Sequence, residues 1–232
     1  RYPKLTQGKS LNPDDPAYAA YYTQAQIKGV VAYAKARFIT IVPEIEMPGH
    51  SGAALAAYPE LGCAPVETAV AWTCALERKE GPTSLLLTRQ NVPFVKRERA
   101  QLESVRRGGY VISEATGGAA RAVLIATGSE VALALAAQKL LAQDGIAARV
   151  VSMPSTMEFD RQDAQYRDSV LGRGLPRVAV EAGGSDYWRK YVGLEGAVIG
   201  IDRFGGSAPA GELFKHFGFT PENIAAAVKS RL

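Results

Sequence analysis

Two kinds of hydrophobic spacing, helical and strand-like, follow each other near the N-terminus. A capping box at 23–26 precedes apolar residues at helical spacing, which predicts an amphipathic helix to about Arg37. The β-branched run at 38–42 predicts a buried parallel strand, and the Ala-rich stretch at 52–58 predicts a second helix. This order indicates a helix–strand–helix piece of an α/β protein.

The same pair of patterns returns further along the chain. A helical pattern covers residues 66–76, and an apolar run at 84–88 predicts another buried strand. Residues 91–107 are polar and strongly charged, which favours a solvated linker between domains. The basic residues of this linker are Lys96, Arg97, Arg99, Arg106 and Arg107.

From residue 108 onward the alternation becomes regular. The predicted strands are 110–113, 122–127, 148–152, 178–180 and 198–201, and the predicted helices are 130–143, 159–171, 209–217 and 221–231. We expect the first of these strands to lie at a sheet edge. Strands alternating with helices predict a mainly parallel sheet with helices on both faces.

Composition narrows the classes of protein. Apolar residues make up 47% and charged residues 22% of the 232, as in globular proteins. Cys63 and Cys74 form neither a disulfide framework nor a metal-ligand pattern, which favours a reduced, cytoplasmic chain. No stretch reaches the roughly 18 apolar residues that span a bilayer. The start, RYPK, lacks Met and the apolar core of a signal peptide, which suggests a truncated or processed start.

The charge pattern argues against nucleic-acid binding. The net charge is +4, and acidic residues interrupt the one basic run. A nucleic-acid surface needs a denser basic stripe with stacking aromatic residues.

Motifs in the second part resemble those of transketolases, and they occur in that family's order. They are VETAVAW at 66–72, GPT at 81–83, LTRQN at 87–91, IATGSEV at 125–131, RVVSMPS at 149–155, VEAG at 180–183, YVG at 191–193 and FGGSAP at 204–209. The resemblance implies that 64–107 ends a pyrimidine-binding domain with its linker, and that 108–232 is the C-terminal domain. In the family this last domain mostly supports dimer contacts.

The first 63 residues resemble a different family, the N-acetylhexosaminidases. The matching stretches are YTQ at 22–24, VAYA at 31–34, VPEIEMPGHS at 42–51 and AAYPELGC at 56–63. Because the switch falls between Glu60 and Val66, the chain is interpreted as a chimera. It is an engineered fusion, a recombination product or an assembly error, and residues 1–63 are then a fragment of a (β/α)8 barrel.

The transketolase resemblance implies a two-carbon transfer between sugar phosphates. That reaction uses thiamine diphosphate with a divalent metal, Mg or Ca. The family's Gly-Asp-Gly metal-diphosphate motif does not occur in the 232 residues. We therefore expect no cofactor on this chain alone, and no catalytic residue of its own.

One substrate contact carries over from the family. Arg89 follows a predicted strand, and a guanidinium there can hold a sugar phosphate bidentately. Without the resemblance, Arg89 is interpreted as a solvated surface charge. Two polar turns have plain structural interpretations: Ser129 as a helix N-cap rather than an anion site, and Glu181 as the end of a strand rather than a catalytic carboxylate.

The hexosaminidase resemblance implies a pocket lined by Glu46 and His50. The family uses an adjacent Asp-Glu pair with Glu as general acid, and this dipeptide is absent. The family also usually has Asp where Glu46 stands. We therefore interpret His50 as a loop residue rather than a catalytic one.

Three functions remain open. The chain is a transketolase-derived C-terminal module that is inactive alone and acts with complementing transketolase domains. Alternatively, it is a non-catalytic structural remnant that dimerises. A β-N-acetylhexosaminidase is the third. In the first two, sugar phosphates bind weakly or not at all, and neither nucleic acid nor membrane is a partner.

Overall fold

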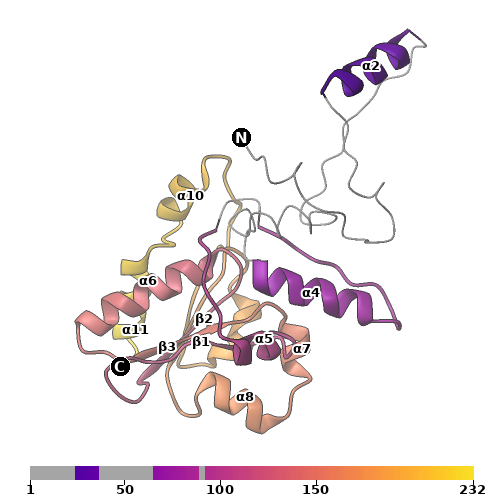
Figure 1. The fold of residues 1–232 in the computed structure, drawn as a ribbon. Coiled ribbons are helices and arrows are strands. Elements are labelled where there is room, and N and C mark those ends of the chain that lie inside the picture. The colour runs from indigo at the N-terminus through magenta and orange to yellow at the C-terminus, as the bar shows by residue number, and fades with distance from the viewer. Residues whose placement is uncertain (1–23, 37–64, 89–91) are drawn as a thin grey trace. The chain divides into compact units, whose positions relative to one another are not determined.

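The computed structural model describes residues 24–36, 65–88 and 92–232 (Figure 1). The chain divides into two compact units, 1–63 and 64–232. In the first unit the described element is α2 (Gln24–Lys35), which confirms the helix predicted there. The strand and helix predicted at 38–42 and 52–58 lie outside the described residues. Across the described residues, no helix has the length and apolarity needed to cross a membrane.

A five-stranded sheet forms the centre of the second unit. Its strands are β1 (Tyr110–Ser113), β2 (Ala122–Ala126), β3 (Ala148–Ser152), β4 (Arg177–Val180) and β5 (Ala197–Ile199). They lie in the order β1-β3-β2-β4-β5, and β1 alone runs antiparallel to its neighbour. The predicted mainly parallel sheet is confirmed, with its first strand at the edge.

Helices cover both faces of this sheet (Figure 1). One face carries α6 (Glu130–Gln143) and α11 (Pro221–Lys229). The elements α7 (Thr156–Asp160), α8 (Ala164–Leu171), η3 (Asp186–Trp188) and α9 (Arg189–Val192) contribute to the other hydrophobic cluster. Since strand side chains alternate, Leu124 packs with the α6 cluster while its neighbours Val123 and Ile125 pack with the second cluster.

The helix predicted at 159–171 is two helices, α7 and α8. Asp163 separates them because its Oδ1 accepts a hydrogen bond from the Tyr166 N–H (2.7 Å) and so caps α8. Trp188 and Tyr191 belong to the core of the second cluster, since the two residues are 4% and 3% exposed.

Residues 65–98, named the arm below, precede this sheet. The arm begins with α4 (Pro65–Glu77), as the helical pattern predicts, and its described residues at 78–88 and 92–98 form neither helix nor strand. The strand predicted at 84–88 is wrong: no strand forms there, and Leu86 is 95% exposed. A strand needs a neighbour for its backbone groups, and the sheet of the second unit does not supply one. The segment predicted as linker holds another helix, α5 (Arg99–Val105).

Candidate functional site

The parallel strands of the sheet end together at one edge. From β2 the chain crosses to β3 on one side, whereas β4 pairs with β2 on the other side. The carboxyl ends of β2 and β4 therefore flank the point where the strand order reverses. In open α/β sheets ligands gather in the crevice at this point.

Two glutamates stand at this reversal point. Glu130 opens α6 just after β2 and is 4% exposed, and Glu181 follows the last residue of β4. Burial raises the pKa of Glu130. Burial, together with the charge of Glu130, raises the pKa of Glu181 to about 7. Within the described part of the chain, the buried Oε2 of Glu181 has no hydrogen-bond partner.

Ser129 occupies the predicted N-cap position but does not cap α6 with its side chain. Its backbone is already helical, with φ −67° and ψ −26°, and its Oγ donates to Glu130 Oε2 instead (3.0 Å). The prediction of an ordinary N-cap is therefore wrong in its chemistry. The Ser129 hydroxyl supports a buried carboxylate rather than the helix end.

The arm reaches this same edge. A Cβ added to Gly128, whose φ is +56°, would lie 3.4 Å from Thr88 Cγ2. Thr88 therefore lies against the turn that connects β2 to α6. Arg89, the predicted phosphate contact, is the next residue and lies outside the described residues. Glu46 and His50, predicted from the other resemblance, also lie outside them.

A buried polar cluster fastens the arm to the sheet. Glu67 Oε1 on α4 accepts three hydrogen bonds, from Arg97 Nη2 (3.0 Å), Tyr110 Oη (2.6 Å) and Ser152 Oγ (2.6 Å). Arg97 Nε also donates to the Tyr110 oxygen (3.0 Å). The arm is thus held near both of its ends to the carboxyl end of β3 and the start of β1.

The cluster corrects the interpretation of the basic run. The Arg97 side chain is 4% exposed and forms an ion pair with Glu67, so it is not a solvated linker charge. Burial disfavours the charged guanidinium, but the Glu67 carboxylate and the Tyr110 hydroxyl together more than offset this and leave the Arg97 pKa raised. Burial and the same carboxylate raise the pKa of Tyr110.

Sequence reasoning missed the Glu67 cluster entirely. A signal was present, because Glu67 falls inside the apolar 66–76 helix pattern and Ser152 ends an apolar strand. The pairing of positions 67 and 97 is not visible in any local pattern, since it depends on how the arm folds back.

Family models and relatives fit this geometry. Residues 108–220 match the transketolase-like C-terminal domain. The matched residues hold all five strands of the sheet. Transketolase 1 of Escherichia coli K12 is 54% identical over 171 residues, which cover 73% of this chain and 26% of that protein. The chain therefore spans about a quarter of the length of the curated transketolases it matches.

Solved structures show the same relation. Transketolase from Leishmania mexicana has a TM-score of 0.65 and 40% identity, covering 72% of this chain and 24% of that one. A Pichia stipitis transketolase complex with sedoheptulose 7-phosphate gives the same values. A second family model, glycosyl hydrolase family 20 catalytic domain, matches residues 1–97. This match runs beyond the junction at 60–66 expected from the sequence.

Proposed function

We propose that the chain is a transketolase-derived C-terminal module that acts only with a partner supplying the upstream domains. The reaction of such an assembly is transfer of a two-carbon unit between sugar phosphates, and its location is the cytoplasm. Arg89 contributes a guanidinium for the substrate phosphate. Its neighbour Thr88 supports this role, because it lies at the carboxyl edge of the sheet beside the reversal point.

The observation that carries the proposal is the exposed apolar surface of the arm. Its exposed apolar residues are Trp72 (38%), Leu76 (70%), Leu86 (95%), Leu87 (48%) and Phe94 (57%). Apolar side chains clustered in one segment mark a surface that a partner covers. This chain covers about a quarter of the transketolases that it matches. The partner that we propose for this surface is the remaining part of such a transketolase.

The residues of this chain do not fit the thiamine diphosphate site. In the ranges 24–36, 65–88 and 92–232, no group of three or more His, Cys, Asp or Glu side chains is placed to hold a metal ion. The Gly-Asp-Gly motif is absent from the sequence as well. The cofactor and its Mg or Ca ion therefore belong to the partner in this proposal.

Complementation tests the proposal. The purified chain is mixed with a transketolase truncated before its last domain, and two-carbon transfer from xylulose 5-phosphate is followed with the cofactor and metal present. We expect activity from the mixture and none from either component. An inactive mixture in which the two components form a complex overturns the catalytic role. The alternative function, a non-catalytic remnant that dimerises, would then remain, and sedimentation of the chain alone would test whether it forms a dimer.

The family 20 match favours a hexosaminidase origin for the first unit. We propose that this unit has no hydrolase activity, since the Asp-Glu pair of that family is absent. An assay with a chromogenic N-acetylglucosaminide should therefore show no release.

A further inference from the structure

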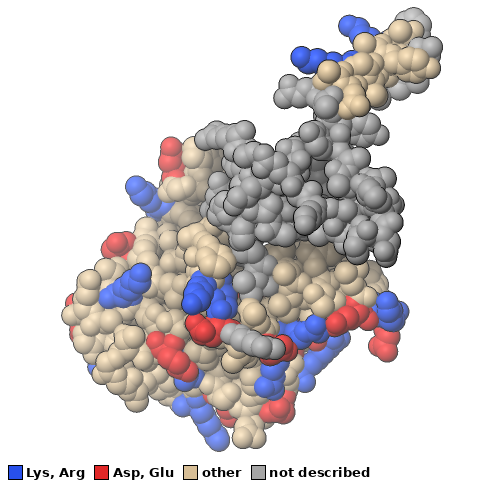
Figure 2. Space-filling model, viewed as in Figure 1, with Lys and Arg blue, Asp and Glu red and all other residues tan. Residues whose placement is uncertain are grey.

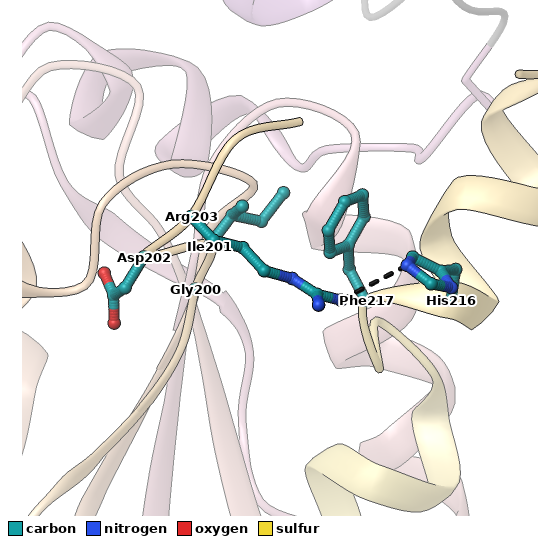
Figure 3. Close-up of a pocket in the computed structure, with 6 residues that line it drawn as sticks. All are labelled: Gly200, Ile201, Asp202, Arg203, His216 and Phe217. Carbon is teal, nitrogen blue, oxygen red and sulfur yellow. Dashed lines mark hydrogen bonds between the residues drawn. The ribbon is translucent and has the colours of Figure 1, made fainter. Parts of the chain in front are cut away.

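A small cavity opens beyond the carboxyl end of β5 (Figure 3). Its volume is about 240 Å³, below the ~300–1,000 Å³ of pockets for drug-sized ligands, so its occupant is small. The lining residues are Gly200, Ile201, Asp202, Arg203, His216 and Phe217. His216 ends helix α10 (Ala210–His216), and the others come from the segment after β5 and from the end of α10.

Two basic side chains of the lining, Arg203 and His216, contact each other at this cavity. Arg203 Nη2 lies 3.2 Å from His216 Nε2, and the guanidinium carbon lies 4.9 Å from the centre of the Phe217 ring (Figure 3). A guanidinium only donates hydrogen bonds, so Nε2 is the acceptor and the imidazole is neutral in this arrangement. The bond to His216 engages one of five guanidinium N–H groups, and the fork geometry suits a tetrahedral oxyanion.

The acidic residue of the lining is turned away from the bases. The Asp202 carboxylate accepts from the Ser185 N–H (2.8 Å) and from Ser185 Oγ (2.7 Å), and Figure 3 shows it pointing to the opposite side. These bonds, from the backbone first, hold the pKa of Asp202 below its usual value. The Asp202 carboxylate, which would repel an anion, is thus hydrogen-bonded to Ser185 and directed away from Arg203 and His216.

The same contacts fix the segment that carries Arg203. The Ile201 N–H donates to the Gly183 carbonyl (2.8 Å), and a Cβ on Gly200 would lie 2.9 Å from that oxygen. Only glycine permits this close approach. On the other side, Phe219 is 2% exposed and anchors the turn after His216. Both bases therefore project from held backbone, which lowers the entropy cost of binding.

We propose that this cavity binds a phosphoryl dianion, as inorganic phosphate or as a small phosphate monoester, between Arg203 and His216. Protonation of His216 breaks its bond with Arg203 and brings two cations together. An anion between them relieves that repulsion and accepts from both. Binding of the anion and protonation of the imidazole therefore favour each other, and the coupling is reciprocal.

Two other charged residues near His216, Glu212 and Lys215, provide control variants for the test below. Glu212 lies one turn earlier on α10, at the (i, i+4) position, and opposes an anion. Lys215 precedes His216 in the same helix but does not line the cavity. Removing Glu212 therefore strengthens binding, whereas removing Lys215 changes only the general charge.

The test follows the His216 imidazole by NMR in the full chain. The sequence has two histidines, so a His50→Gln variant assigns the signal. Inorganic phosphate, glycerol 1-phosphate and acetate are titrated separately at about pH 6 and about pH 8, on either side of the usual imidazole range. We expect a phosphoryl ligand to raise the protonation midpoint of His216. Since phosphoryl groups take up a proton near pH 6, affinities are expressed per dianion, and on that scale the ligand should bind at least ~5-fold tighter at the lower pH.

The variants decide between a site and diffuse attraction. Arg203→Gln should weaken phosphoryl binding at least ~10-fold, about the loss of one charge-assisted bond, and Glu212→Gln should tighten it. Lys215→Gln and Arg89→Gln should leave the His216 response unchanged, which also separates this cavity from the proposed substrate contact. Equal weakening by Lys215→Gln, or tighter binding of acetate than of either phosphoryl ligand, overturns the proposal. Tighter binding of inorganic phosphate than of glycerol 1-phosphate would identify free phosphate as the ligand, and the reverse order would identify a phosphate monoester.

Discussion

At the scale of single residues, one carboxylate oxygen holds three chain segments together. Glu67 Oε1 receives Arg97, Tyr110 and Ser152, and the Glu67 and Arg97 side chains are 11% and 4% exposed. A buried ion pair adds little net stability, but removing one partner leaves the other charge unpaired. The cluster therefore matters most when it is broken.

Glu67→Ala should destabilise the second unit by about 3–5 kcal/mol, because it strands the buried Arg97 guanidinium. Urea unfolding followed by Trp fluorescence measures the change. Tyr110→Phe is the matched control, since it removes the two hydrogen bonds of the Tyr110 hydroxyl, to Glu67 and from Arg97, and keeps the ion pair. It should cost about 1–3 kcal/mol, less than the loss of the carboxylate. Equal losses from the two variants would contradict this account.

Glu181 should make the stability of the fold depend on pH. Its pKa is raised in the folded state from 4.5 to about 7, so the native state binds more protons than the unfolded state between these values. The contribution of Glu181 to the free energy of unfolding is therefore complete below about pH 4.5 and is lost as the pH rises through about 7. Partial exposure limits the loss to about 1–2 kcal/mol.

Glu181→Gln removes this dependence and should be more stable than the parent chain at about pH 8, by the same ~1–2 kcal/mol. Thermal unfolding across the pH range measures the difference between the two proteins. Glu195→Gln, at an exposed carboxylate, is the control and should show a constant difference. A flat Glu181→Gln difference as well would show that this carboxyl group does not titrate near neutrality.

At the scale of elements, close backbone packing fixes how the chain passes from α5 into β1 beside the start of α7. Gly108, between α5 and β1, has φ +83°, and a Cβ there would lie 2.3 Å from the Ser155 carbonyl oxygen and 2.4 Å from the Phe159 nitrogen. Neither atom belongs to a flexible side chain. A glycine is therefore required both for its dihedral angle and for its size.

Gly108→Ala should cost at least about 3 kcal/mol and shift the start of α7. Gly117→Ala is the control, since Gly117 has the same φ of +83° with no atom within 4 Å of the added Cβ. It should lose only the ~1 kcal/mol of a left-handed alanine. Denaturant midpoints of the two variants give the comparison, and similar midpoints would refute the steric argument.

Elements of the second unit were predictable wherever the local pattern and the packing agree. The strands at 110–113 and 148–152 and the helix at 130–143 have the predicted bounds, because their apolar residues meet partners within the chain. The run at 84–88 has the same local pattern but pairs with no strand of the residues that the structure describes, so prediction failed there. The site was less predictable: Arg89, Glu46 and His50 lie outside the described residues, and the Glu67 cluster depends on contacts between distant segments.

At the scale of the whole molecule, the charged surface is mixed. Figure 2 shows acidic and basic side chains interspersed over the described part of the face in view. The arm's exposed apolar side chains are the more distinctive surface, and the proposed partner contact depends on them.

Leu86→Ser combined with Phe94→Ser should abolish complementation by a truncated transketolase while changing stability by less than about 0.5 kcal/mol, because both side chains are exposed. Co-sedimentation and the two-carbon transfer assay measure the effect. Leu194→Ser, at a residue 97% exposed outside the arm, should keep full complementation. If both variants complement equally well, the arm is not the docking surface.

The two outer strands of the sheet have a consequence for how this chain behaves at high concentration. β5 has three residues, and the pairing of β1 with β3 shifts register between Val111 and Ser113. Because one edge strand is short and the other is irregular, neither offers a regular row of backbone groups with which a strand from another chain could pair. The sheet thus resists growing into fibrils by recruiting the apolar run at 84–88 from neighbouring copies.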